Sequence, residues 1–268
     1  MAVELVLETR EADVVTLTLN DPERRNAMSE AMGRALAQRC ERLEHDAELR
    51  ALILAGAGRA FSAGGDFDML ERLTERAHAD AQARPEVRDF MRGYYALFLS
   101  LRRVPCPTIA ALHGHAIGAG LAVALACDVR LVAREARLGV NFARVGLPPG
   151  MGSSWTLPRL VGPSLAAELL YTGRLIDGEE AARIGLASRA LPTAEVPEAA
   201  RALAREIAAS APLAVRGARR ALRESGSHDL AAQLDLEAAE QALCYSSDDM
   251  REGLAAAREG RAPLFRGR

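Results

Sequence analysis

The sequence predicts an α/β fold followed by an all-helical C-terminal region. Up to about residue 200, short apolar runs typical of strands alternate with longer stretches of helical periodicity. Two of these units, residues 51–70 and 108–127, repeat the order strand, glycine-containing turn, helix. Beyond residue 200 the chain is alanine-rich and helical throughout. We therefore expect an α/β core over residues 1–200 and a helical, oligomerisation region over residues 201–268.

The composition is that of an ordinary globular protein. The chain has 268 residues, of which 49% are hydrophobic and 26% charged, and this length is enough for a sizeable core. Its net charge of −2 gives no reason to expect nucleic acid or an anionic membrane as a partner. All 34 basic residues are arginines, so mechanisms that need a catalytic lysine are excluded.

The cysteines and apolar runs indicate where the protein works. Its four cysteines, Cys40, Cys106, Cys127 and Cys244, form no CxxC pair, which is typical of reduced thiols in a cytoplasmic protein. The N-terminus lacks the apolar core of a signal peptide. The longest apolar stretch, residues 116–127, is shorter than the roughly 20 residues that cross a bilayer. We expect a soluble protein without a membrane partner.

The first elements follow from alternation and periodicity. Residues 3–9 and 14–20 alternate apolar and polar side chains around a short acidic turn, which predicts a β-hairpin. Residues 28–49 have helical spacing, with Ser29 as the expected N-cap. Residues 51–55 form a short apolar run and are expected to be a buried strand.

The central part contains two helices and three further strand candidates. Residues 68–83 and 86–104 have helical character and are separated by Pro85. Residues 108–112 and 129–133 are short buried strands, and 137–142 is a strand or a turn. Further helices are expected at residues 164–171, 178–184, 197–209, 212–224, 229–244 and 248–258. The last of these have little apolar surface for a core of their own, so they should pack on the α/β body or on another subunit.

The two glycine turns suggest one shared site. The first turn contains Ala63, Gly64 and Gly65, and the second runs from Gly114 to Gly120 and enters an apolar helix. Small residues leave backbone N–H groups open to a ligand, and a helix N-terminus adds the positive end of its dipole. If both turns converge on one carbonyl oxygen, they form an oxyanion hole. The alternatives are a surface turn with Asp66 as a helix cap and close helix packing.

Several segments, in order along almost the whole chain, resemble the crotonase superfamily of enoyl-CoA hydratases and isomerases. FSAGGDF (61–67) and HGHAIGAGLAVALACD (113–128) resemble its two oxyanion segments, and Arg24 to Met28 resembles its coenzyme A segment. GLPPGMGSSWTLPRLVG (146–162), LLYTGRLIDGEEAARIGLASRAL (169–191) and PLFRGR (263–268) fit as well.

The resemblance implies a spiral of ββα repeats with C-terminal helices, assembled as a homotrimer or a dimer of trimers. It assigns the oxyanion donors to the backbone N–H groups of Ala63 and Ala119. It implies an acyl-CoA thioester as substrate, with coenzyme A as part of that substrate and no prosthetic group. The residues that it places near the substrate are Arg24, Arg25, Ala27, Ala60, Asp66, Phe67, Phe142 and Phe265.

The family's acid/base carboxylates are absent. Hydratases of the family use two glutamates, whose positions hold Ala122 and Phe142 here, and the isomerase acid falls on Gly150. We therefore expect slow hydration of ordinary enoyl-CoA. Replacement proton carriers are Asp68 or Glu71 on the following helix, His115, or Tyr94 and Tyr95, although Asp68 and Glu71 are more typical of a solvated helix face.

Three further hypotheses belong to other classes. The chain could bind an acyl-CoA without turning it over, as a binding module. His113 and His115 have the spacing of a metal pair, but no third ligand is evident, so no metal is expected. The same fold supports serine peptidases, and Ser62, Ser153 and Ser154 lie in glycine-rich turns without a nucleophile-elbow pattern.

Overall fold

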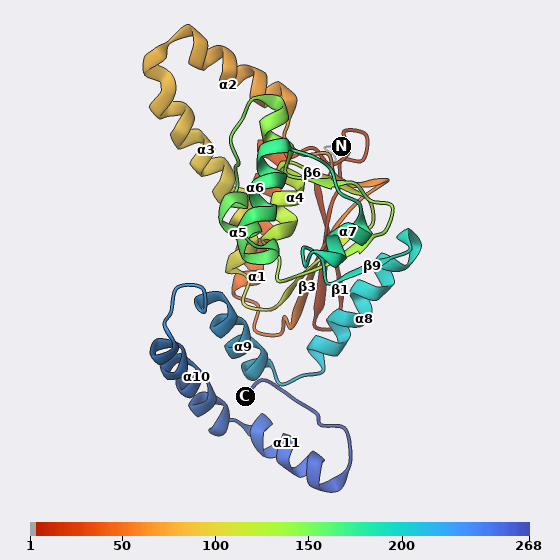
Figure 1. The fold of residues 1–268 in the computed structure, drawn as a ribbon. Coiled ribbons are helices and arrows are strands. Elements are labelled where there is room, and N and C mark those ends of the chain that lie inside the picture. Colours follow the sequence, from red (N-terminus) through yellow and green to blue (C-terminus); the bar gives the residue numbers. More distant parts are fainter. Residues whose placement is uncertain (1–3) are drawn as a thin grey trace.

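The computed structural model describes residues 4–268, and a six-stranded sheet forms its centre (Figure 1). The strand order is β1-β2-β3-β5-β7-β9. β1 and β2 form the antiparallel hairpin, with Val6 opposite Leu19, and all later neighbours are parallel. The bounds are β1 Val6–Glu11, β2 Val14–Leu19, β3 Ala51–Gly56, β5 Thr108–Leu112, β7 Val129–Ala133 and β9 Arg189–Leu191.

A second, smaller sheet contains the strands that lead to the functional turns. It is parallel, with the order β4-β6-β8, and comprises β4 Ala60–Ser62, β6 His115–Ile117 and β8 Leu138–Gly139. The chain thus passes three times from a strand of the large sheet to a strand of the small sheet and then to helical structure. This confirms the predicted spiral of ββα repeats, including the relation between residues 51–70 and 108–127.

Helices cover the sheets and extend from them. Their bounds are α1 Glu30–Glu44, α2 Phe67–Ala79, α3 Arg84–Leu99, α4 Ala119–Leu125, α5 Ser153–Val161, α6 Pro163–Thr172, α7 Gly178–Arg183, α8 Val196–Ala208, α9 Pro212–Glu224, α10 Leu230–Tyr245 and α11 Asp248–Glu259. Short 3₁₀ turns lie at Ala81–Ala83, Ser100–Arg103, Asn141–Val145 and Thr193–Glu195. α8 packs on β3, β5 and β7, whereas α9–α11 extend away from the sheets (Figure 1).

Several predicted boundaries needed correction. The first strand begins at Val6, and the part of the prediction at Val3 lies outside the described residues. The helix that Ser29 caps ends at Glu44, because an Asp46 side chain that accepts from the Glu48 N–H turns the chain. Pro85 does not interrupt a helix but occupies the first turn of α3, where its missing N–H costs nothing.

Other elements were missed or mistaken. β6 lies where the sequence predicts part of a turn, because three residues are too few for a visible alternation. Residues 137–142 divide into β8 and a 3₁₀ turn. The sequence patterns do not predict α5, because Gly152 and Pro158 are untypical of a helix, and they do not predict the short strand β9. The expected division at residue 200 falls inside α8, so the protruding helices begin with α9.

Candidate functional site

Three successive turns meet at one edge of the small sheet. β4 pairs with β6 through Ala60 and His115, and β6 pairs with β8 through Ala116 and Leu138. All three strands are parallel, so the residues that follow them emerge at the same edge. These are the first glycine turn after Ser62, the start of α4 after Ile117, and the 3₁₀ turn that begins at Asn141. The topology therefore brings both predicted oxyanion segments together.

The first two turns are in direct contact. A Cβ built on Gly64 would lie 2.6 Å from the Ile117 carbonyl oxygen and 3.7 Å from the Ala119 nitrogen. A Cβ on Gly120 would lie 2.6 Å from the Ser62 Cβ and 2.9 Å from its carbonyl oxygen. Gly64 also has a φ of +99°, a left-handed conformation that favours glycine. The glycines thus permit the close approach of the two turns.

The hydrogen bonds of the first turn decide which N–H groups can reach a ligand. The Ala63 N–H donates to the Arg25 carbonyl at 2.9 Å, and the Gly64 N–H donates to the Ser62 hydroxyl at 3.1 Å. The Gly65 N–H has no acceptor within residues 4–268. This pattern does not support the prediction that Ala63 supplies the first donor, because its N–H is already used. The open donor of this turn is Gly65.

Ala119, the second predicted donor, lies at the start of a helix. Ala119 is the first residue of α4, so its N–H has no acceptor within the helix. Gly118 precedes it with a φ of +52°, and the Gly118 N–H donates to the Gly139 carbonyl of β8 at 2.7 Å. The helix begins where its dipole is positive, and the side chain at position 119 is a small methyl group. Ala119 thus presents a backbone donor beside the Gly64 turn.

Asn26 lies in the segment from Arg24 to Met28, although no sequence pattern singles out this residue, and it braces the first turn. Its side chain is fully buried, and its amide nitrogen donates to the carbonyls of Ala57, Ala60 and Phe61 at 2.9–3.1 Å. The Ser62 hydroxyl donates to the Asn26 carbonyl at 2.8 Å. Asn26 has a left-handed φ of +54°, a conformation that asparagine tolerates. This backbone conformation is visible only in the structure, so it could not point to Asn26 from the sequence.

Most of the predicted substrate-binding residues lie together around this turn. Arg24 is half-exposed, and its guanidinium donates to Asp66 at 3.1 Å and to Asp68 at 3.4 Å. Asp66 also caps α2 by accepting from the Met69 N–H, and Phe67 is 65% exposed. Arg25, Ala27 and Ala60 belong to the two segments that hydrogen-bond to each other here.

Phe265 lies elsewhere in the chain. Its ring packs against Gly253 of α11, and its carbonyl accepts from Arg50 at 2.8 Å. Arg50 immediately precedes β3, whereas Ala60 and Asp66 follow the other end of that strand. A single chain therefore does not bring Phe265 together with the other predicted substrate-binding residues.

The three positions where the sequence resemblance leads us to expect carboxylates hold small or apolar residues. Ala122 is buried in α4, and Phe142 is half-buried in the 3₁₀ turn and packs against the core. Gly150 is buried, and a Cβ built on it would lie 2.9 Å from the Tyr95 hydroxyl. A carboxylate at position 150 would therefore collide with Tyr95 in its present position.

The residues predicted as replacement proton carriers are either exposed or already hydrogen-bonded within the protein, with the exception of Tyr95. Asp68 and Glu71 are exposed on α2. His115 is exposed, and its Nδ1 accepts from the Arg137 N–H at 2.9 Å. The Tyr94 hydroxyl donates to the Met28 carbonyl, and burial raises the pKa of this phenol. Of these two tyrosines, only Tyr95 has a hydroxyl without a hydrogen-bond partner in the described chain.

The hypotheses of other classes gain no support from the side chains. The His113 ring is hydrogen-bonded to the Gly58 carbonyl at 2.9 Å, and no group of His, Cys, Asp and Glu within residues 4–268 is arranged to hold a metal ion. The hydroxyls of Ser62 and Ser153 donate to backbone carbonyls at 2.8 and 2.7 Å. None of the helices that the structure describes could cross a membrane.

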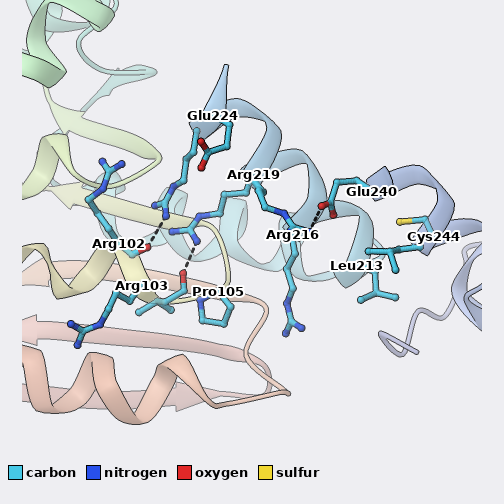
Figure 2. A pocket seen from close by; sticks show the side chains of 13 residues that line it. Arg102, Arg103, Pro105, Leu213, Arg216, Arg219, Glu224, Glu240 and Cys244 are labelled. Atoms are coloured by element: carbon cyan, nitrogen blue, oxygen red, sulfur yellow. Dashed lines mark hydrogen bonds and ion pairs between the residues drawn. The ribbon is translucent and has the colours of Figure 1, made fainter. Parts of the chain in front are cut away.

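A cavity of about 440 Å³ lies apart from the turns, between α9 and the segment after α3 (Figure 2). Its lining includes the arginines Arg102, Arg103, Arg216, Arg219, Arg220 and Arg223. Asp128, at the end of the second glycine segment, is 2.7 Å from Arg219 and 3.2 Å from Arg223. Burial alone would raise the pKa of this carboxyl, but the two guanidinium groups outweigh it and hold the pKa below its usual value. This cluster fastens α9 to the body.

Comparison with known proteins agrees with this architecture. The family model for enoyl-CoA hydratase/isomerase matches residues 9–268. The chain is 34% identical over 266 residues to 1,2-epoxyphenylacetyl-CoA isomerase of Escherichia coli, covering 99% of both chains. It is 35% identical to mitochondrial methylglutaconyl-CoA hydratase of Mus musculus, covering 97% of this chain and 82% of the relative.

Solved structures give the same result. An enoyl-CoA hydratase from Bacillus anthracis superposes with a TM-score of 0.87 at 33% identity, covering 98% of this chain and 100% of the other. The match extends over the sheets, the turns and the C-terminal helices, because nearly all of both chains is included. The chain belongs to the enoyl-CoA hydratase/isomerase family of the crotonase superfamily.

Proposed function

We propose that this chain binds an acyl-CoA thioester and polarises its carbonyl between the backbone N–H groups of Gly65 and Ala119. The observation that carries the proposal is the direct contact of the two turns at the ends of β4 and β6. Gly65 takes the role that the sequence assigns to Ala63, since the Ala63 N–H is bonded to Arg25. Relatives named for acyl-CoA substrates support the substrate class.

The chemistry of such a pair is the stabilisation of negative charge on the thioester oxygen. As a proton leaves Cα or a nucleophile adds at Cβ, charge moves to this oxygen and the two N–H groups hold it. Losing one donor of this type costs about 3 kcal/mol of transition-state stabilisation. Coenzyme A enters as part of the substrate, and no prosthetic group is needed. Arg24 and Arg25 would face its phosphates, beside Ala27, Ala60, Asp66 and Phe67.

The reaction class is that of a hydratase or isomerase, with slow hydration of ordinary substrates. Water addition needs a group that activates water and a group that protonates Cα. Ala122, Phe142 and Gly150 can do neither. An apolar Phe142 in the 3₁₀ turn instead favours packing against a hydrophobic part of the acyl group.

Crotonyl-CoA tests this directly, because hydration removes the absorbance of its conjugated double bond. We expect crotonyl-CoA to bind, as measured by calorimetry, and its absorbance to fall far more slowly than about 10 turnovers per second, a typical enzyme rate. Turnover at or above that rate would show that the missing carboxylates do not matter.

A second candidate function is an acyl-CoA-binding module without turnover. It is favoured by the absence of all three carboxylates together with the exposed positions of Asp68 and Glu71. A panel of acyl-CoA thioesters incubated with the protein and screened by mass spectrometry separates the two. Any enzymatic product excludes the binding module, whereas binding without product from the whole panel favours it.

A further inference from the structure

Tyr95 occupies the space that a side chain at position 150 would fill. It lies on α3 and is half-buried. A Cβ on Gly150 would be 2.9 Å from the Tyr95 hydroxyl oxygen and 3.3 Å from the ring carbon that bears it. A side chain at position 150 and the present position of Tyr95 therefore exclude each other. The phenol stands where the family resemblance places the isomerase acid.

Tyr94 connects Tyr95 to the first turn. Its ring centroid is 6.1 Å from that of Tyr94, whose hydroxyl donates to the Met28 carbonyl. The Met28 N–H in turn donates to the Gly64 carbonyl of the first turn at 2.8 Å. The 3₁₀ turn that precedes Gly150 in the chain begins with Asn141, whose side-chain oxygen would be 3.3 Å from a Cβ on Gly118. Gly118 is the residue before the donor Ala119.

The Tyr95 hydroxyl is a side-chain group beside Gly150 that is left for a ligand. It makes no hydrogen bond to any residue from 4 to 268. The nearby Ser153 hydroxyl, in contrast, donates to the Gly150 carbonyl. Burial raises the pKa of the Tyr95 phenol, so it keeps its proton at neutral pH. A protonated phenol with a free O–H is a hydrogen-bond donor and not a base.

We propose that the Tyr95 hydroxyl donates a hydrogen bond to an oxygen on the acyl chain and so selects acyl groups that carry one. The preferred substrates are then acyl-CoA thioesters with a hydroxyl or carbonyl group near the thioester, in an otherwise apolar surrounding made by Ala122 and Phe142. This inference rests on the proposed acyl-CoA function and assigns a substrate class to it. Tyr95 is a specificity-determining residue in this scheme.

Two thioesters that differ by one oxygen test the proposal. Titration calorimetry would compare 3-hydroxybutyryl-CoA with butyryl-CoA in the wild-type protein and in Tyr95→Phe. The wild type should bind the hydroxylated thioester about tenfold more tightly, because one well-formed hydrogen bond changes the affinity by about this factor. Tyr95→Phe should abolish this preference and leave the affinity for butyryl-CoA unchanged.

Two further variants make the result specific. Gly150→Ala places a methyl group against the Tyr95 oxygen, which must move, so this variant should lose the preference while keeping the phenol. Tyr171→Phe is the matched control, because Tyr171 is 80% exposed, and it should keep the preference.

The outcomes separate this inference from the function on which it rests. A wild type that binds both thioesters equally, or a Tyr95→Phe variant that keeps the preference, overturns the role of Tyr95 alone. A wild type that binds neither thioester overturns the proposed acyl-CoA function as well.

Discussion

At the scale of single residues, the candidate site depends on backbone N–H groups whose availability is set by their neighbours. Ala63 and Gly65 are two positions apart, yet within the described residues 4–268 only the Ala63 N–H is bonded, to Arg25. The same turn is anchored by the buried Asn26, whose amide serves three carbonyls. Leaving buried carbonyls without donors costs about 1–3 kcal/mol each, which explains why a polar side chain is held in this part of the core.

The residues at positions 122, 142 and 150 each fit their own surroundings. Gly150 is matched to Tyr95, since any side chain there would meet the phenol. Ala122 faces closely packed surroundings in α4, all of whose residues are buried. Phe142 packs partly against the core. Packing thus accommodates all three residues, and each of these positions is small or apolar.

At the scale of elements, α9 is fastened to the body by Asp128. This carboxylate accepts from Arg219 and Arg223 and from both the N–H and the hydroxyl of Thr108. We predict that Asp128→Asn lowers the free energy of unfolding at pH 7 by about 3 kcal/mol, because two partly buried guanidinium groups lose their anion. Urea unfolding measures this change.

The pH dependence of the same variant checks the cause. The folded-state pKa of Asp128 is depressed, so its contribution is present above the unfolded pKa of about 3.9 and is lost as the pH falls through the folded value. The gap between wild type and Asp128→Asn should shrink below pH 4. An equal gap at pH 3 and pH 7 would contradict the ionic explanation. Asp248→Asn, at a carboxylate that is 66% exposed, should change stability little at either pH.

At the scale of the whole molecule, the C-terminal helices look incomplete in a single chain. α10 buries none of its residues, and exposed apolar side chains on α9 and α10 include Leu222, Leu230, Leu234, Leu243 and Tyr245. Apolar surface of this extent marks an interaction site. We propose that it packs on another copy in a homotrimer or a dimer of trimers.

Light scattering coupled to size-exclusion chromatography tests the assembly. We predict a mass of three or six chains for the wild type and a monomer for the double variant Leu230→Glu/Leu234→Glu, because two charges would have to be buried in the interface. The matched double variant Glu75→Gln/Glu86→Gln, on exposed positions of α2 and α3, should keep the wild-type mass. A monomeric wild type would refute the proposal.

Much of the architecture could be predicted from the sequence because it depends on local patterns of apolar and turn residues. Runs such as residues 108–112 and 129–133 are short, apolar and bounded by turn residues, and both became strands with those bounds. β6, β8 and β9 have two or three residues each, which is too few to show a period. α5 contains a proline and starts after a glycine, so its composition indicates a loop.

The site could be located from the sequence but not resolved to its atoms. The small residues of the two turns predicted their convergence, whereas the choice between the Ala63 and Gly65 N–H groups depends on a hydrogen bond to Arg25, 38 residues earlier. The free hydroxyl of Tyr95 beside Gly150 likewise arises from segments distant in sequence. No local pattern carries such information, because it is created when α3 packs against the chain after β8.

The infrared band of the thioester carbonyl tests the proposed oxyanion hole most directly. Butyryl-CoA labelled with ¹³C at this carbon should absorb at lower wavenumber when bound to the wild type than in water, because two N–H groups polarise the bond. Gly93→Ala, where a methyl group meets nothing within 4 Å, should give the same shift. Gly120→Ala, whose methyl group would collide with Ser62 and separate the turns, should abolish it. A carbonyl that is bound to the wild type but absorbs at its solution wavenumber would contradict the hole between Gly65 and Ala119.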